Sequence, residues 1–217
     1  MNISEIMQWR YSTKSFDTSK KIAPETLQQL KDALRWSPSS TNLQPWHFVL
    51  AASEEGKAQI AKSAAGLFQF NESKILNASH VVVLCGQAHT SNEHLQQVLD
   101  QEDADGRYDK PENKQYMGGA RQMFLNIHRY TLKDETQWHA KQTYISMGSL
   151  LLAAAALGVD AVPIEGLDFA VLDQELGLQS KGYTALAVVA LGYRAADDFN
   201  AKLPKSRLPE QQIITEI

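Results

Sequence analysis

Two short basic segments, one near each end of this 217-residue chain, carry side chains suited to binding phosphate. The first is Arg10-Tyr11-Ser12-Thr13-Lys14 and the second is Lys205-Ser206-Arg207. Arginine offers a rigid fork of N–H donors, lysine offers a compact charge, and both suit a phosphate group. The two segments would form a phosphate clamp if the fold brings them together, and would otherwise be solvated surface runs.

Two further segments carry groups that can hydrogen-bond a ligand. Residues 37–42 read SPSSTN, a turn-rich composition with short hydroxyl and amide side chains that can reach the polar edge of a ring. Residues 163–166 read PIEG and end an expected strand at a glycine, where backbone N–H groups could point into a cleft. An ordinary connecting turn is the alternative interpretation of 37–42, and 163–166 is a weak signal when it stands alone.

Motifs of several other chemistries are absent from the sequence. It contains no G-x-G-x-x-G after a strand, no Walker A sequence, no C-x-x-C, no H-E-x-x-H and no G-x-S-x-G. The histidines are scattered without ligand spacing, so we expect no metal site. Dinucleotide-fold, ATP-dependent, metal-dependent and serine-nucleophile chemistries therefore have no support from motifs.

Composition narrows the class of protein further. The formal net charge of −4 argues mildly against a nucleic-acid partner, which usually requires a basic excess. The single cysteine, Cys85, lies in the apolar run 80–85, so we expect a buried core thiol and no internal disulfide. The N-terminus does not resemble a signal peptide, and the most apolar segment, 147–159, is too short to span a bilayer. We therefore expect a cytoplasmic protein with no membrane partner.

The hydrophobic pattern predicts one domain over 1–217 in which helices and strands alternate irregularly, as in a layered α/β or α+β fold. Helices are expected at 2–9, 24–36, 54–65, 71–78, 91–103, 112–131 and 135–157, and strands at 46–50, 81–85, 159–164 and 184–191. The helices at about 91–131 form an excursion that could shape a substrate cleft. The second half of helix 135–157 is apolar on every face, which suits either a dimer core or the central helix of a monomer.

Six segments, taken together and in this order, resemble the nitroreductase family, and specifically its oxygen-insensitive, NAD(P)H-dependent branch. The resemblance extends over nearly the whole chain. Each motif is a modest signal alone, and the ordered set is a specific one. The motifs are Arg10–Lys14, Ser37–Trp46, Phe70-Asn71, Asp100–Arg107, Ala161–Gly166 and Leu203–Arg207.

The resemblance implies an α+β fold with a mixed central sheet flanked by helices. It also implies an intertwined homodimer with C-terminal strand exchange, in which Ile213-Ile214 would join the partner's sheet. Each of two interfacial active sites would bind one FMN, with NADH or NADPH as the electron donor. The all-apolar helix would then be dimer core.

The resemblance also implies residues for the cofactor site. Arg10, Ser12, Lys205 and Arg207 would hold the FMN phosphate and ribityl chain, Lys14 and Asn71 would face the polar ring edge, and the partner's 38–42 loop would complete the site. Tyr11 stands where family members often have histidine, so only its backbone contact is carried over. The full cofactor-binding set is Arg10, Tyr11, Ser12, Thr13, Lys14, Pro38, Ser39, Ser40, Asn42, Asn71, Pro163, Ile164, Glu165, Gly166, Lys205, Ser206 and Arg207.

Two residues are expected to act on the flavin during the reaction. The resemblance implies that the backbone of Glu165 approaches flavin N5 and that Lys14 stabilises negative charge on the reduced ring. Lys74 and Arg107 would meet the phosphates of NAD(P)H, although a surface ion pair with the acidic run 100–105 is the alternative for Arg107. The expected substrate-binding residues are Lys14, Thr41, Phe68, Phe70, Lys74, Arg107 and Phe124, the last of which could instead be a core aromatic.

The implied activity is a ping-pong, two-electron reduction of nitroaromatics, quinones and similar acceptors, with the chemistry supplied by the flavin. An NAD(P)H:flavin reductase or a dihydropteridine reductase would use the same fold and cofactor. A flavin-binding protein without turnover, or a binder of another phosphate ligand, belongs to a different class and stays open at this stage.

Overall fold

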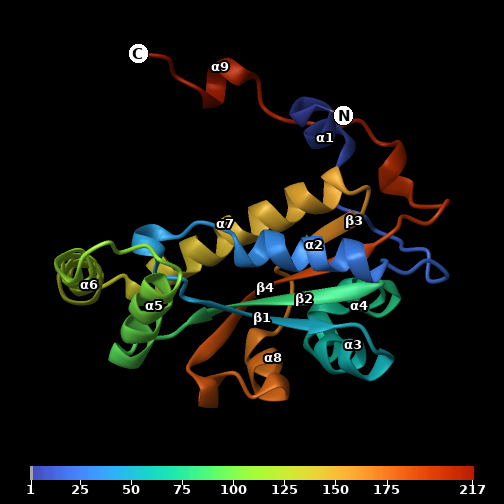
Figure 1. Cartoon of the computed structure of the whole chain (residues 1–217). Helices are drawn as coiled ribbons and strands as arrows, with labels where there is room; N and C mark the ends of the chain where they lie inside the picture. The colour runs from blue at the N-terminus through green and yellow to red at the C-terminus, as the bar shows by residue number, and fades with distance from the viewer. Residues whose placement is uncertain (1) are drawn as a thin grey trace.

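Four strands form one sheet in the computed structural model, which describes residues 2–217, and their order is β1-β2-β4-β3 (Figure 1). The strands are β1 (Trp46–Ala51), β2 (His80–Gln87), β3 (Asp160–Ile164) and β4 (Tyr183–Gly192). Each neighbouring pair is antiparallel, and an isolated parallel bridge joins Ser12 to Ala161. The expected mixed sheet is thus corrected to a sheet whose four strands are antiparallel.

Helices cover both faces of this sheet. α2 and α7 lie on one face, and α3, α4 and α8 lie on the other (Figure 1). The fold is therefore a three-layer arrangement of the α+β class, which is the class that the resemblance implied. The helices are α1 (Ile3–Trp9), α2 (Pro24–Arg35), α3 (Glu54–Ala61), α4 (Glu72–Asn77), α5 (Asn92–Ala104), α6 (Pro111–Asn126), α7 (Glu135–Ala156), α8 (Phe169–Leu176) and α9 (Glu210–Ile213).

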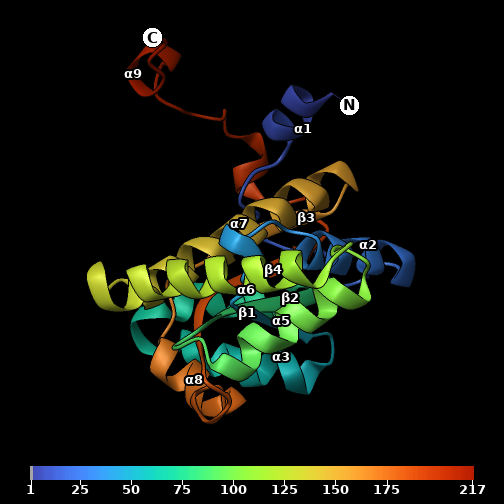
Figure 2. The same cartoon turned by 60° about the vertical axis from the view of Figure 1, so that its left-hand side comes forward.

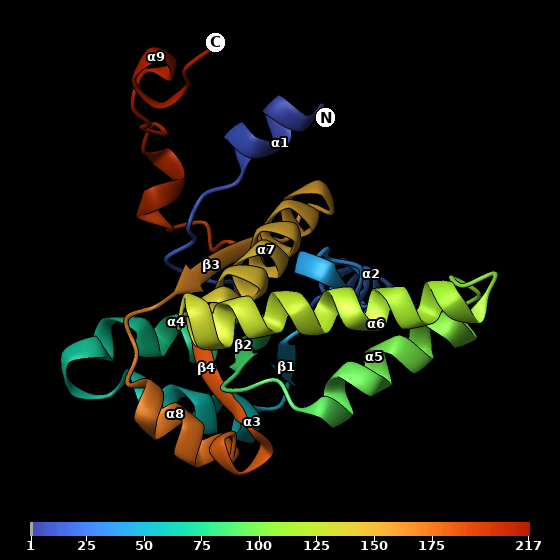
Figure 3. The ribbon, with the colours of Figure 1, turned by 90° about the vertical axis from the view of Figure 1, so that its left-hand side faces the viewer.

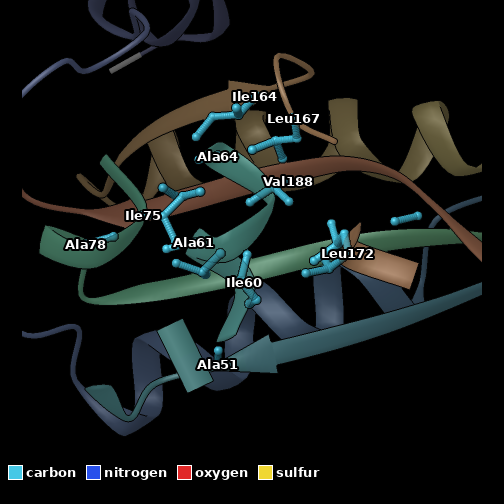
Figure 4. Packing of buried hydrophobic residues seen from close by; sticks show 14 of the residues in the cluster. Ala51, Ile60, Ala61, Ala64, Ile75, Ala78, Ile164, Leu167, Leu172 and Val188 are labelled. Atoms are coloured by element: carbon cyan, nitrogen blue, oxygen red, sulfur yellow. The ribbon is translucent and has the colours of Figure 1, made fainter. Parts of the chain in front are cut away.

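The two central strands are apolar on both faces because both faces are covered. All eight residues of β2 are buried, and alternate side chains enter opposite cores. Val188 joins the core under α3, α4 and α8, together with Ile60, Ile75 and Leu172 (Figure 4). Its neighbour Val189 joins the core under α2 and α7. This burial fixes the register of the strands, because a slip of one residue would move each side chain from the core on one face of the sheet to the core on the other.

Most expected elements are present, with differences at their ends. The helix expected at 112–131 ends at Asn126, and a π-helical turn continues to Thr131. Helix α8 was missed, although Asp168 caps its N-terminus and Gly177 ends it at a φ of 59°. Cys85 is buried as expected, and burial raises the pKa of its thiol to about 12. Among residues 2–217, no helix combines the length and apolarity needed to cross a membrane.

Two parts of the single chain are left uncovered. α1 has no buried residue, residues 201–217 are all exposed, and both segments stand away from the sheet (Figures 2 and 3). The apolar second half of α7 was expected to be buried all round, but within one chain Leu151 is only half-buried and Ala156 is exposed. Earlier in α7, Ile145 is 43% exposed. Ile213 ends the one-turn helix α9, so strand exchange through the tail stays a prediction.

Candidate active site

The two basic segments from the ends of the chain line one cavity of about 600 Å³. Arg10 and Ser12 face it from the segment after α1, and Lys205 and Arg207 face it from the C-terminal tail. The Lys205 ammonium donates to the backbone carbonyls of Met7 (2.5 Å) and Arg10, which holds the tail against the end of α1. The fold thus brings the two segments together, which is the condition for a phosphate clamp.

Four cations line this cavity, and three of them have no anionic partner in the part of the chain that the structure describes; the fourth, Arg194, pairs with Asp160. Within residues 2–217, neither Arg10, Lys205 nor Arg207 takes part in a salt bridge. Burial lowers the pKa of Arg10, and the nearby charge of Arg207 lowers it further. Burial likewise lowers the pKa of Lys205, as do Arg10 and Arg207. An anion placed among them would replace this mutual repulsion with attraction.

A buried carboxylate fixes the N-terminal half of the clamp. Asp198 accepts hydrogen bonds from the Tyr11 hydroxyl (2.9 Å) and from the Lys14 backbone N–H (3.0 Å). The Asn200 amide donates to the Ser12 carbonyl at 2.8 Å. Burial and the bond to Asp198 raise the pKa of Tyr11 to about 12. The Tyr11 side chain therefore positions the segment.

Arg194, two residues after the end of β4, supports the same segment and pairs with Asp160 of β3. Its Nε donates to the Asp160 carboxylate at 2.9 Å, and its guanidinium lies 4.5 Å from the ring centres of both Trp9 and Tyr11. Asp198 and Arg194 were not predicted as site residues, because they lie in no motif and reach the clamp only through the fold. The sequence offered one signal for them: Tyr11 stands where family members often have histidine, and a tyrosine hydroxyl removed from solvent requires a hydrogen-bond partner.

A second cluster lies where β3 ends. The Asn71 amide donates to the Gly166 carbonyl at 2.9 Å, and the Lys74 ammonium donates to Asn71 Oδ1 at 2.7 Å and to the Phe70 carbonyl at 2.6 Å. Lys74 is 9% exposed, and burial, with the charge of Lys14, lowers its pKa. The Lys74 ammonium thus holds Asn71 in place, and its expected contact with NAD(P)H phosphates stays a prediction.

The turn at Glu165–Gly166 is fixed from two sides. The Tyr144 hydroxyl, on α7, donates to Glu165 Oε1 at 2.5 Å. Burial and this bond raise the pKa of Tyr144 to about 12. A Cβ added at Gly166 would lie 2.9 Å from Asn71 Nδ2 and 3.3 Å from the Phe68 ring, so the close approach requires glycine. Glu165 and Gly166 were predicted as site residues from the sequence, whereas Tyr144 was not.

The loop after α2 has a strained backbone. Thr41, Asn42 and Gln44 have φ values of 52°, 53° and 51°, which are uncommon for residues other than glycine. The Ser39 hydroxyl accepts from the Gln44 N–H at 2.9 Å, and Gln142 of α7 accepts from the Ser40 N–H at 2.8 Å. Such a conformation persists because several bonds specify it, and strain of this kind is concentrated at functional sites.

A buried ion pair anchors this loop to α5 and α6. Arg121, 1% exposed, contacts both carboxylate oxygens of Glu102 at 2.8 and 2.9 Å and donates to the Thr41 carbonyl at 2.9 Å. The Asn42 amide donates to Glu102 at 2.7 Å, and Tyr108 donates to the other oxygen. Burial alone would raise the pKa of Glu102, but these donors outweigh it and lower the pKa.

The expected site residues thus fall into two groups in one chain. The 38–42 loop is held by Gln142 of α7, whereas Leu151, farther along α7, lines the clamp cavity. At a rise of about 1.5 Å per residue, these α7 positions are roughly 13 Å apart. Phe124 is 41% exposed on α6, so it is not a core aromatic within the single chain. Arg107 has no salt bridge among residues 2–217, and Asp100 and Asp103 pair with Lys114 instead.

Comparisons with known proteins agree with this geometry. The model of the nitroreductase family matches residues 7–193. The chain is 54% identical, over the full length of both proteins, to an oxygen-insensitive NAD(P)H nitroreductase of Salmonella typhimurium. It is 32% identical to the major NAD(P)H-flavin oxidoreductase of Aliivibrio fischeri, over 95% of this chain and 94% of that protein. A solved structure from Exiguobacterium sibiricum, described as a candidate nitroreductase in complex with FMN, superposes with a TM-score of 0.81 at 27% identity and covers 100% of this chain and 98% of its own.

Proposed function

The chain belongs to the nitroreductase family, and we propose that it is an FMN-dependent oxidoreductase that uses NAD(P)H to reduce nitroaromatic compounds, quinones and similar acceptors. The observation that carries this proposal is the cavity lined by Arg10, Lys205 and Arg207, whose charges lack partners among the described residues. An enzyme that binds a phosphorylated flavin requires this kind of site. The 54% identity over the whole chain supports the same activity.

The residues present fit FMN. Its phosphate would lie among the three cations and Ser12, whose hydroxyl side chain suits a phosphate oxygen. Pro163 lies on the cavity wall, so the cavity extends from the clamp towards the end of β3. The close approach of Asn71 to Gly166 leaves no room for a larger side chain beside the expected ring position. These features match a group with an anionic end and a planar polar end.

When bound, FMN supplies the two-electron chemistry, and the protein supplies orientation and charge. Lys14 would place an ammonium beside the polar ring edge, where a fixed charge stabilises the electron-rich reduced form. Asn71 is held by Lys74 and Gly166, and the Glu165 turn is held by Tyr144, so both are positioned before any ligand binds. Phe70, 66% exposed, would offer an apolar wall to the stacked donor or acceptor.

We infer a homodimer in which each active site takes its clamp from one chain and its 38–42 loop from the other. The separation of these groups along α7 supports this arrangement, as do the exposed apolar face of α7 and the uncovered tail. A twofold interface would make the exchange reciprocal. Phe124 and Thr41 of the partner would then complete the acceptor pocket beside the flavin ring, together with Phe68 and Phe70.

Mixed dimers test this arrangement. One variant carries Arg207→Ala with Lys205→Ala, a second carries Ser40→Trp, and each should lose most activity as a homodimer. In a co-expressed heterodimer, one site combines the intact clamp of one chain with the intact loop of the other. We expect close to half of wild-type activity. Inactivity of purified heterodimers would contradict a site shared between chains.

The absorption spectrum of the purified protein, before and after anaerobic NADH, tests the proposed activity. We expect bound flavin whose visible bands bleach with NADH and recover when nitrofurazone or a quinone is added. A protein that stays colourless after added FMN would contradict the proposal. Bound flavin that neither NADH nor NADPH bleaches would favour a flavin-binding protein without turnover.

A second candidate activity is NAD(P)H:flavin reduction, which the 32% identity to the Aliivibrio fischeri enzyme supports. Steady-state rates with free FMN, nitrofurazone and quinones would separate the two uses of the site. A dihydropteridine reductase stays a further alternative, tested with a quinonoid dihydropteridine as acceptor. Location in the cytoplasm stays a prediction from the sequence, and cell fractionation would test it.

A further inference from the structure

A chain of polar groups connects the first half of α7 to the strained loop after α2. It begins at His139, whose Nδ1 lies 2.9 Å from the Gln87 carbonyl and whose Nε2 lies 3.1 Å from the Thr90 hydroxyl. That hydroxyl lies 3.1 Å from one end of the Gln87 amide, and the other end of the amide lies 3.0 Å from His94 Nδ1. The chain ends where His94 Nε2 lies 2.7 Å from the Leu43 carbonyl.

The last bond of this chain holds the backbone of the strained loop. Leu43 lies between Asn42 and Gln44, whose φ values are 53° and 51°. The Leu43 carbonyl and the Gln44 N–H belong to one planar peptide group. His94 binds its carbonyl, and the Ser39 hydroxyl accepts from its N–H at 2.9 Å. A peptide group held on both sides cannot turn, so His94 helps to fix Ser39, which is expected to contact FMN.

The chain needs one proton more than its neutral side chains supply. Carbonyl oxygens accept at both of its ends, so His94 and His139 must each point a ring N–H outward. Along the chain, each neutral ring, the amide and the hydroxyl supplies one hydrogen, whereas each of the five bonds requires one. All five bonds therefore form together only when one of the two histidines carries a second ring proton.

Burial places this proton on His94. His139 is fully buried, and desolvation lowers its pKa despite its bond to the Gln87 carbonyl. A neutral His139 accepts from the Thr90 hydroxyl. The Gln87 amide, which can turn by 180° without moving its contacts, must then donate to Thr90 and present its oxygen to His94. His94 is only partly buried, and it binds both Gln87 and Leu43 as a cation but only one of them as a neutral ring.

The other ionisable groups packed around the chain are paired or exposed. From α7, Glu135 is paired with Arg129. The side chain of His89, which lies outside these bonds, is 80% exposed. Residues 37–44 contain no ionisable side chain. Carboxylates and guanidinium groups do not titrate between about pH 5 and 8, so a proton taken up by the chain in this range belongs to His94. The groups of α5 and α6 near the loop are the Glu102–Arg121 pair and the exposed Glu93.

We propose that His94 is a positioning residue of the active site, which takes up one proton and in that state fixes the 38–42 loop in the conformation that contacts the cofactor. As the pH rises through the range in which histidine titrates, His94 gives up one of its two bonds, and the peptide group after Leu43 can turn. The effect on flavin binding rests on the proposed function, whereas the proton-binding chain is a property of the apoprotein.

The affinity of the apoprotein for FMN at about pH 6 and pH 8 tests the effect on the site. The phosphate of FMN titrates in this range as well, but it does so with every variant. Between these pH values, we expect wild type to lose roughly five- to tenfold more affinity than Thr90→Val, in which the Gln87 amide is free to donate to a neutral His94. His94→Gln keeps a donor for the Leu43 carbonyl but takes up no proton, so it should resemble Thr90→Val. The control His89→Gln should resemble wild type.

Two further measurements separate a positioning role from a merely structural one. His94→Leu, which removes both bonds, should bind FMN more weakly than His94→Gln at both pH values. Nitrogen NMR of the apoprotein, labelled in its histidine rings, reports the protons directly. We expect His94 to change from two ring protons at about pH 5.5 to one at about pH 8, and His139 to keep a single proton on Nδ1 throughout.

Three results would overturn the role of His94. They are a second proton on His139, a His94 ring that keeps one proton at about pH 5.5, and the same pH dependence of FMN affinity in wild type and Thr90→Val. Apoprotein that binds FMN at neither pH would overturn the proposed function, and the NMR result would still decide whether the chain takes up its proton.

Discussion

Positive charge is paired with a carboxylate at one end of the molecule and left unpaired in a cavity at the other. At the 38–42 loop, Arg121 is fully buried and its charge is met by Glu102 within the same chain. At the clamp, Arg10, Lys205 and Arg207 share a cavity without any carboxylate from residues 2–217. The first arrangement fixes a shape, whereas the second leaves charge available for a ligand. A cation therefore indicates binding when its surroundings fail to neutralise it.

The largest effect on the free energy of unfolding is expected from substituting Arg121, whose charge is paired with Glu102. Arg121→Met leaves Glu102 buried without its cation, and we expect a loss of about 3–5 kcal/mol in the free energy of unfolding. Urea denaturation followed by circular dichroism measures it. The double variant Glu102→Leu with Arg121→Met removes both charges and should recover most of this loss. A single-variant effect below about 1 kcal/mol would show that the pair does not hold this end together.

Substitutions in the clamp should change the affinity for FMN and leave the free energy of unfolding nearly unchanged. Arg207→Ala removes one charge-assisted contact to phosphate, so FMN affinity of the apoprotein should fall roughly ten- to a hundredfold. The free energy of unfolding of the apoprotein should not fall, because the substitution also removes a repulsion. Flavin fluorescence titration and urea denaturation measure the two quantities. A large loss of apoprotein stability would mean that Arg207 has a structural role like that of Arg121.

A second paired charge predicts how the protein responds to acid. Burial would raise the pKa of Glu135, but hydrogen bonds from Arg129 and from the Thr90 N–H bring it to about 2. Because the folded-state pKa is depressed, the stabilisation is complete above the unfolded value near 4.5 and is lost as pH falls towards 2. This stabilisation should be on the order of 2 kcal/mol. The free energy of unfolding, measured by urea denaturation between pH 4.5 and about 2, should therefore decline less steeply in Glu135→Gln than in wild type or in the exposed control Glu112→Gln. Parallel declines in all three proteins would contradict the assignment.

The smallest effect concerns the support of the clamp. Tyr11→Phe keeps the ring against Arg194 but leaves Asp198 without one donor, which should cost about 1 kcal/mol in the free energy of unfolding. FMN affinity should fall by less than in Arg207→Ala, because the cations remain. If Tyr11→Phe weakens FMN binding as much as Arg207→Ala, the tyrosine hydroxyl touches the cofactor and does not merely position the segment.

The sequence predicted the parts of this account that depend on local pattern. The apolar run of β2, the length of α7 and the two basic segments were all readable from neighbouring residues. The bonds that orient the clamp were not readable, because Tyr11 and Asp198 lie 187 residues apart. Nothing in the composition of residues 37–42 distinguishes a strained loop fixed by Glu102 and Arg121 from an ordinary turn.

The antiparallel direction of the four strands could not be predicted from the sequence for a related reason. Each strand can be recognised alone from its apolar pattern, but its direction depends on how the connections cross the sheet. The split of the site residues into two groups was likewise invisible within any one motif. It emerges only when the 38–42 loop and the clamp are placed along α7.

The most direct test of the account compares FMN with riboflavin, which lacks the phosphate, as ligands of the apoprotein. Dissociation constants would be measured for wild type and for the double variant Lys205→Ala with Arg207→Ala. We expect wild type to bind FMN far more tightly than riboflavin, and the double variant to lose most of that difference while its riboflavin affinity changes little. Equal loss of affinity for both ligands would contradict the claim that the unpaired cations of the clamp bind the phosphate of FMN.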